Sequence, residues 1–475
     1  MHDTPTTTGQ TPLGAGAGEQ EPLSAGLKQR HLTMLGLGGV IGAGLFVGSG
    51  AGIAVAGPGI VLSYLIAGAL AMLIMRMLGE MSSAMPASGA FSVHAERALG
   101  RWAGFSVGWL YWFLLVVVLA VEATGAARIA AGWVPAVPQW GWVLLFMVVF
   151  TVANLAAVKN FGEFEFWFAA LKVTAIVLFL VLGVLAIVGV LPDGPHASGE
   201  PVGMANLTGH GGFLPHGWGG VVSGVLAVVF AFGGLEVVTI AAAESDDPAR
   251  AVGRAVRSAV WRILFFYVGS MLVIVALLPW SSLQPGQSPY VAVLDRLGVP
   301  GAGQIMNVVV FVALLSALNA NLYGSSRMVF SLAERGEAPR GLLKVSGGGV
   351  PRRAVLASVA FGFVSVLLNL KWPDSVFLYM LNAVGAVLLF VWGLIAVSQL
   401  RLRPRLERAA GGQLPLRMWA FPYLTWVALL AMAGVVVLML TDDAARPQLL
   451  WSAGATGAVL VVAGVRELRA RRTRH

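Results

Sequence analysis

Long apolar stretches, separated by short polar segments that are mostly basic, dominate the pattern of this 475-residue chain. A run of about 20 apolar residues is long enough to cross a bilayer as a helix. Twelve such runs predict an all-α integral membrane protein with twelve transmembrane helices. The predicted spans are 32–54, 59–81, 102–131, 140–158, 165–190, 219–243, 260–280, 303–330, 354–371, 375–399, 418–440 and 448–465.

The polar segments set the predicted domain limits and orientation. Residues 1–27 are rich in Thr, Gly, Pro and Gln, so we expect a disordered tail and not a cleaved signal peptide. The transporter domain then covers 28–465, and 466–475 form a basic tail. With the N-terminus inside, 23 of the 31 Lys and Arg residues fall in inner loops and tails, and four fall at outer ends. This bias predicts that both termini are cytoplasmic.

The first predicted span is interrupted by glycine. Eight glycines lie between Gly36 and Gly52, and each costs a helix about 1 kcal/mol relative to alanine. We therefore expect the helix to unwind near 41–44. Unpaired backbone at membrane depth is tolerated where it lines a cavity or is buried in protein. Its free N–H groups favour a carboxylate, so the segment predicts a carrier for a small anionic or zwitterionic solute.

The sixth predicted span has a second interruption, at Gly233 and Gly234. Close helix packing would also explain glycines in either span. However, spans one and six enter from opposite sides, and paired interruptions are typical of inverted-repeat transporters. We predict a first repeat over about 32–190 and a second over about 219–399. The helices within 418–465 are then additional.

Three ionisable residues lie well inside the predicted spans: Glu122, Lys172 and Glu236. An intramembrane charge costs at least about 2.5 kcal/mol, which makes a function the default hypothesis. Lys172 and Glu236 both fall in the inner half of the membrane, so we predict that they pair and carry a coupling proton. A static salt bridge is the alternative. Glu122 lies in the outer half, where a structural hydrogen bond and a role in coupling are equally compatible with its position.

Composition excludes other classes of protein. Hydrophobic residues make up 57% of the chain and charged residues only 11%, against roughly 25% charged in soluble domains. The chain has no cysteine, no histidine within a span and no HisGluXxxXxxHis motif, so we expect neither an enzyme, a metal site nor a cofactor. The basic residues lie in loops, and we expect no nucleic acid partner. The expected partners are a small solute, protons and the lipid bilayer.

Several motifs resemble those of bacterial amino-acid permeases in the amino acid–polyamine–organocation superfamily, and are closest to the γ-aminobutyrate permeases. They are GRWAGFSVGWLYW (100–112), VKNFGEFEFWFAALKVTAI (158–176), TIAAAESDDP (239–248), WRILFFY (261–267), SSRMVFSLAERGEAP (325–339), AVSQLRLR (396–403) and RMWAFPYLTW (417–426). The resemblance implies a LeuT-type, five-plus-five inverted repeat with two extra helices. It also implies proton-coupled uptake of γ-aminobutyrate or another small neutral amino acid across a bacterial plasma membrane. An exchanger or a non-transporting sensor of the same fold is the alternative.

The resemblance also implies a site. The substrate carboxylate is expected at the backbone of Gly42, Ala43 and Gly44, and the ammonium at carbonyls around Ile41, Phe230, Ala231 and Phe232. The predicted lining adds Ser316, Asn319 and Asn382. Lys172 stands where sodium-coupled relatives hold a cation, which favours protons. Gly44 replaces a serine that is usual in γ-aminobutyrate permeases, and AsnAlaValGly at 382–385 replaces their Ser-Ser-Gly.

Overall fold

The computed structural model describes residues 41–85, 90–156, 161–191, 202–234, 236, 248–283, 286–346, 349–373, 375–441 and 446–472. Over these described ranges every regular element is a helix. The predicted all-α class is therefore confirmed. The N-terminal tail over 1–27 and the first part of the first span lie outside the described residues.

The helices follow the predicted apolar runs closely. In chain order they are α2 (Ala43–Phe46), α3 (Gly48–Ala56), η2 (Gly57–Gly59), α4 (Ile60–Ala84), α5 (Ala90–Leu99), α6 (Arg101–Trp133), α7 (Gln139–Ala156), α8 (Phe161–Ile187), α9 (Met204–Gly209), α10 (Gly217–Val229), η3 (Phe230–Phe232), α12 (Pro248–Arg262), η4 (Ile263–Gly269), α13 (Ser270–Leu277), η5 (Trp280–Ser282), α14 (Pro289–Arg296), α15 (Ala302–Glu334), η6 (Arg340–Leu343), α16 (Arg352–Lys371), α17 (Val376–Ala409), α18 (Tyr423–Thr441) and α19 (Arg446–Arg472).

Ten helical stretches among the described residues are long and apolar enough to cross a membrane. One of them, Gly48–Ala84, runs through parts of the first two predicted spans, and Gly217–Phe232 is a shorter apolar helix in the sixth. The total of twelve membrane crossings therefore stays a prediction.

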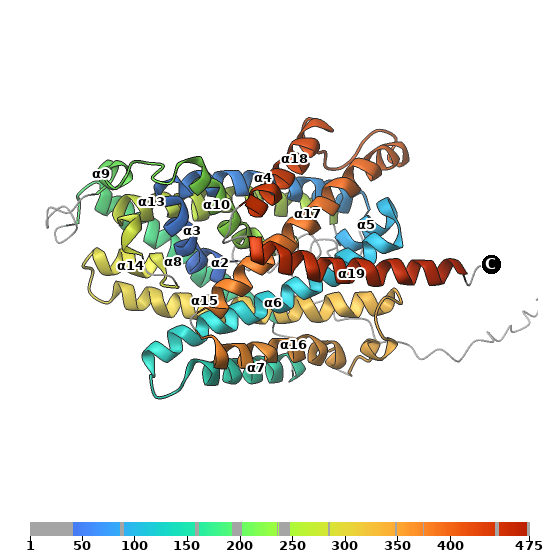
Figure 1. Ribbon diagram of the computed structural model, residues 1–475, viewed down its shortest axis with the longest axis horizontal. Helices are drawn as coiled ribbons and strands as arrows, with labels where there is room; N and C mark the ends of the chain where they lie inside the picture. The colour runs from blue at the N-terminus through green and yellow to red at the C-terminus, as the bar shows by residue number, and fades with distance from the viewer. Residues whose placement is uncertain are drawn as a thin grey trace, which may run out of the picture.

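Two long helices form the centre of the bundle. Figure 1 shows α6 and α15 side by side along the long axis, with α7 and α16 next to them. The residues of α6 are apolar on all its faces, and most of its length is buried. This is expected of a helix with neighbours on all sides. The C-terminal helices α18 and α19 pack against α17 and leave much of their surface exposed, which suits contact with lipid.

Helix α17 continues well past its predicted end at 399, because a buried polar anchor holds the extension. The Glu80 carboxylate is fully buried and accepts hydrogen bonds from Arg403 Nη1 at 2.5 Å and Gln399 Nε2 at 2.7 Å. The backbone N–H of Met418 adds a third donor at 2.6 Å. A buried carboxylate needs such a full set of donors. The contacts fix α4, α17 and the segment before α18 to one another.

Candidate functional site

The interruptions of the first and sixth spans meet in space. The first differs from its prediction near 41–44, because Gly42 is non-helical but Ala43–Phe46 is helical, and the helix breaks at Val47. Helices α2 and α3 are separated by Val47, whose backbone (φ −123°, ψ −47°) leaves the helical path. In the sixth span, η3 ends at Gly233, which is extended, and Gly234 has φ +91°. A Cβ on Gly44 would lie 2.7 Å from Ala231 Cα and 2.9 Å from Phe230 Cδ1. Only glycine permits this contact between the two broken helices.

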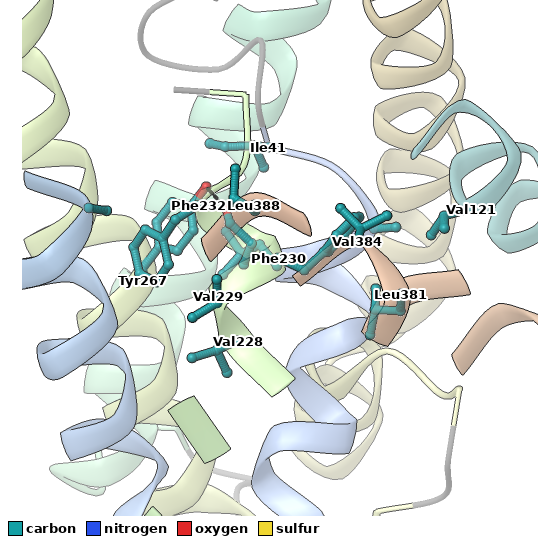
Figure 2. Packing of buried hydrophobic residues seen from close by; sticks show 14 of the residues in the cluster. Ile41, Val121, Val228, Val229, Phe230, Phe232, Tyr267, Leu381, Val384 and Leu388 are labelled. Atoms are coloured by element: carbon teal, nitrogen blue, oxygen red, sulfur yellow. Dashed lines mark hydrogen bonds between the residues drawn. The ribbon is translucent and has the colours of Figure 1, made fainter. Parts of the chain in front are cut away.

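Apolar side chains surround the meeting point (Figure 2). Ile41 and Phe232 come from the two interrupted spans and are fully buried, and Phe230 is 6% exposed. Val384 and Leu388 of α17 close this cluster. Charged side chains brought here therefore need specific partners.

The first of these charged side chains, Glu122, has an unexpected partner. The buried Glu122 carboxylate on α6 accepts the backbone N–H of Ala43 through both oxygens, at 3.1 Å to Oε1 and 3.0 Å to Oε2. A Cβ on Gly42 would collide with Glu122 Oε1, so glycine is required beside it. The amide predicted for the substrate carboxylate is thus bound by a carboxylate of the protein itself.

Lys172 on α8 is fully buried, and the charges that act on it are those of Glu165 and Glu122. Glu236 is not among these charges. The pairing of Lys172 with Glu236 stays a prediction, and the charges that act on Lys172 favour Glu165 and Glu122 as its partners. Sequence analysis put both residues at a similar depth, in the inner half of the membrane. The partner of a buried charge also depends on the direction in which each helix faces.

Glu236 has a different environment, beside the second interruption. Its Oε2 accepts the backbone N–H of Gly234 at 3.0 Å and Tyr111 Oη at 3.3 Å, and its Oε1 accepts Trp392 Nε1. These donors come from the interrupted span itself, from α6 and from α17. The carboxylate therefore satisfies a backbone group that the broken helix leaves free. This geometry favours a role in holding the interruption.

Tyr267 holds the other side of the same interruption. Its hydroxyl donates to the carbonyl of Ala231 at 3.0 Å, and its ring stacks on Phe232 with centroids 5.1 Å apart. Tyr267 belongs to η4, a π-helical turn, and such turns are frequent at functional sites. Sequence analysis missed this residue, although it closes the WRILFFY motif.

Two predicted lining residues contact a buried carboxylate that was also missed. Ser316 Oγ donates to Glu165 Oε2 at 2.9 Å, and Asn319 Nδ2 donates to Glu165 Oε1 at 3.2 Å. Asn154 Nδ2 in turn donates to Asn319 Oδ1 at 2.9 Å. Glu165 stands at the edge of its predicted span and so resembled a boundary residue. Glu165 lies seven residues before Lys172, which is two turns along one helix face. This spacing could have identified it as a neighbour of Lys172. The side chain of Asn382 lies outside the described residues.

Comparisons with known proteins agree with this architecture. The family described as "Amino acid permease" matches residues 31–464. The gamma-aminobutyric acid permease of Bacillus subtilis is 49% identical over 442 residues, covering 93% of each chain. The aromatic amino acid transport protein AroP of Corynebacterium glutamicum is also 49% identical, over 91% of this chain and 93% of its own. The gamma-aminobutyric acid permease of Escherichia coli is 47% identical, over 88% of this chain and 89% of its own.

A solved structure supports the fold alone. The crystal structure of a manganese transporter mutant from Eremococcus coleocola matches with a TM-score of 0.58, 16% identity and 92% coverage of both chains.

Proposed function

Because this chain belongs to the amino acid permease family, we propose that it takes up γ-aminobutyrate or another small neutral amino acid together with protons, by alternating access. The chain is an amino-acid transporter of a bacterial plasma membrane and not an enzyme. The proposal concerns its substrate, its driving ion and its orientation, with both termini in the cytoplasm.

The contact between Glu122 and Ala43 carries the proposal for proton coupling. The substrate carboxylate and the Glu122 carboxylate need the same backbone N–H. Two carboxylates in one buried site repel each other unless one of them is protonated. Protonation of Glu122 therefore frees the Ala43 amide for substrate. Proton and substrate enter the site together, and neither is favoured alone.

Release follows the same logic in reverse. When the site opens to the cytoplasm, Glu122 loses its proton and again binds the Ala43 amide, which displaces the substrate carboxylate. The ammonium of Lys172 lies within the field of Glu122 and stabilises the charged carboxylate that results. Glu165 is the other carboxylate that acts on Lys172 and keeps that buried cation compensated when Glu122 is neutral.

The apolar walls favour a small substrate. Phe230 lies against Gly44, and the ring of Phe232 stacks on Tyr267. Aromatic rings therefore limit the space beside the carboxylate site. The relatives do not decide this point, because one that is named for γ-aminobutyrate and one that is named for aromatic amino acids are equally identical to this chain. The carbonyls around Phe230 and Ala231 would receive the substrate ammonium.

Uptake into empty proteoliposomes tests the proposal. With an inward proton gradient, radiolabelled γ-aminobutyrate should accumulate above its external concentration, and a protonophore should abolish that accumulation. Uptake that occurs only in vesicles preloaded with an amino acid would instead identify an exchanger. Binding without any transport would identify a sensor.

Selectivity should follow charge. We expect γ-aminobutyrate, alanine and other small neutral amino acids to compete with the labelled substrate, because the expected site binds both charged ends through backbone groups. Arginine and glutamate should compete poorly, since a buried extra charge without a partner is strongly disfavoured. The measurement is inhibition of labelled uptake by each unlabelled amino acid at equal concentration. Stronger inhibition by arginine or glutamate than by the neutral amino acids contradicts the proposed pocket.

A further inference from the structure

A cavity of about 240 Å³ lies beside the interrupted first span. Loop 286–288 and helices α6, α14, α15 and α17 contribute to its wall. Since a water molecule occupies about 30 Å³, the cavity has room for a molecule of roughly eight heavy atoms. A small amino acid has this size.

The cavity lies one helical turn from the contact between Glu122 and Ala43. Its lining includes Val47, four residues after Ala43, and Gly125, three residues after Glu122. One turn of helix advances about 5.4 Å, and both helices lead from the contact to the same cavity. Figure 1 shows α14 at the end of the molecule opposite the C-terminus, which is the end that we place outside the cell. The cavity is thus positioned between the outer surface and the site.

A single charged side chain, Arg128, lines this cavity. Across the described residues its guanidinium forms no ion pair. It packs closely against Gly286, whose φ is +80° and where a Cβ would collide with Arg128 Nη1. The loop backbone therefore holds the cation at the cavity wall. An arginine in this position favours a carboxylate, which it can bind through two parallel hydrogen bonds.

A second observation points to a ligand in the same place. Ser288 lines the cavity and is only 7% exposed, yet its Oγ has no hydrogen-bond partner. It occupies the N-cap position of α14, where a serine usually accepts a backbone N–H, but its side chain makes no cap bond. A buried hydroxyl without a partner costs free energy, so a ligand that accepts from Ser288 would be stabilised.

We propose that this cavity is an outer capture site for the carboxylate of an amino acid, with Arg128 as the cation and Ser288 as a hydroxyl donor. The proposal rests on the proposed function, because it supplies the step before the substrate reaches Ala43. Arg128 attracts the carboxylate from solution, and the substrate then moves one helical turn inward. The same positive charge repels amino acids with a cationic side chain.

Uptake kinetics of Arg128→Gln test this site in proteoliposomes. We expect the KM for γ-aminobutyrate to rise about tenfold, which corresponds to about 1.4 kcal/mol, with kcat unchanged. Arg128→Lys should recover part of the loss because it restores the charge but not the planar fork. Ser288→Ala should raise KM by a smaller factor. A wild-type KM in Arg128→Gln, or a lower kcat at unchanged KM, overturns the proposal.

Lys371→Gln is the matched control. Lys371 is exposed beside the ring of Trp372, and it lies at the same end of the molecule, because Asn369 donates to Thr124 Oγ1 on α6. Removing this charge should leave KM unchanged. An equal rise in both variants would mean that general surface charge, and not the cavity, attracts the substrate.

Butyrate separates failure of this site from failure of the proposed function. It has the carboxylate but no ammonium, and it should raise the melting temperature of wild-type protein and Lys371→Gln by more than that of Arg128→Gln. This binding assay needs no transport. If wild-type vesicles do not accumulate amino acids while butyrate still binds through Arg128, the proposed function fails and the site stands. Equal stabilisation of all three proteins by butyrate overturns the site.

Discussion

Replacing Glu122 by glutamine should end proton-driven accumulation while leaving exchange of substrate across the membrane. Glutamine has nearly the same shape, so the space beside Gly42 is kept, but it neither binds nor releases a proton. Without that proton, uptake should stop when the internal and external concentrations are equal. Wild-type uptake should increase as the external pH falls, because protonation frees the Ala43 amide, and the variant should lose this dependence. The measurement is γ-aminobutyrate accumulation in proteoliposomes at several external pH values.

Glu407→Gln is the control for this change. Glu407 pairs with Arg403 at 3.0 Å and its side chain is 39% exposed, so its loss should cost no more than about 1 kcal/mol. This variant should accumulate substrate as wild type does. Normal accumulation by Glu122→Gln, at normal abundance in the membrane, would remove Glu122 from the coupling mechanism.

The electrostatic interaction between Glu122 and Lys172 allows a second test of the same mechanism. Combined with Lys172→Met, the Glu122→Gln change should be non-additive by about 0.5–3 kcal/mol, as expected of residues that interact. Lys172→Met and Glu236→Gln should instead be additive, because Glu236 contacts Tyr111, Trp392 and Gly234. Coupling only in the second pair would support the pairing of Lys172 with Glu236 that sequence analysis predicted.

A Gly44→Val change should abolish uptake. The new Cβ would lie 2.7 Å from the backbone of Ala231 and 2.9 Å from the Phe230 ring, so the two interrupted helices would have to separate. It would also fill the space where the substrate carboxylate is expected. We expect uptake to fall by at least about 100-fold, equivalent to about 2.7 kcal/mol. Initial uptake rates, normalised to the amount of protein in the membrane, give the result.

Gly434→Val provides the comparison. Gly434 lies within α18, and a Cβ there meets no atom within 4 Å. The same substitution at this position should leave uptake unchanged. Gly44→Ala, with a smaller side chain, should lose less activity than Gly44→Val if crowding is the cause. Normal uptake by Gly44→Val would mean that substrate does not bind where the two interruptions meet.

Local physical properties made the helices and the two interruptions predictable. The length of an apolar run determines whether a helix can cross the bilayer, and glycine weakens a helix wherever it stands. Both properties are read along the chain without knowledge of neighbours. For this reason the break at Gly233 was found, and a break in the first span was expected within a few residues of Val47, whereas the extension of α17 to Ala409 was not found. That extension depends on Glu80, which lies on another helix.

The sequence by itself determined an all-α membrane transporter of the amino acid permease type, with two interrupted spans and buried charges. Only the tertiary structure decided which groups those charges contact. Depth along the membrane could be estimated from residue position, but the direction in which a helix faces depends on packing with helices that are distant in sequence. Packing brought Glu122 to Ala43, Glu165 to Ser316 and Tyr267 to Ala231. It also left Arg128 and Ser288 on one cavity wall, since helices and loops far apart in the chain close around the same space.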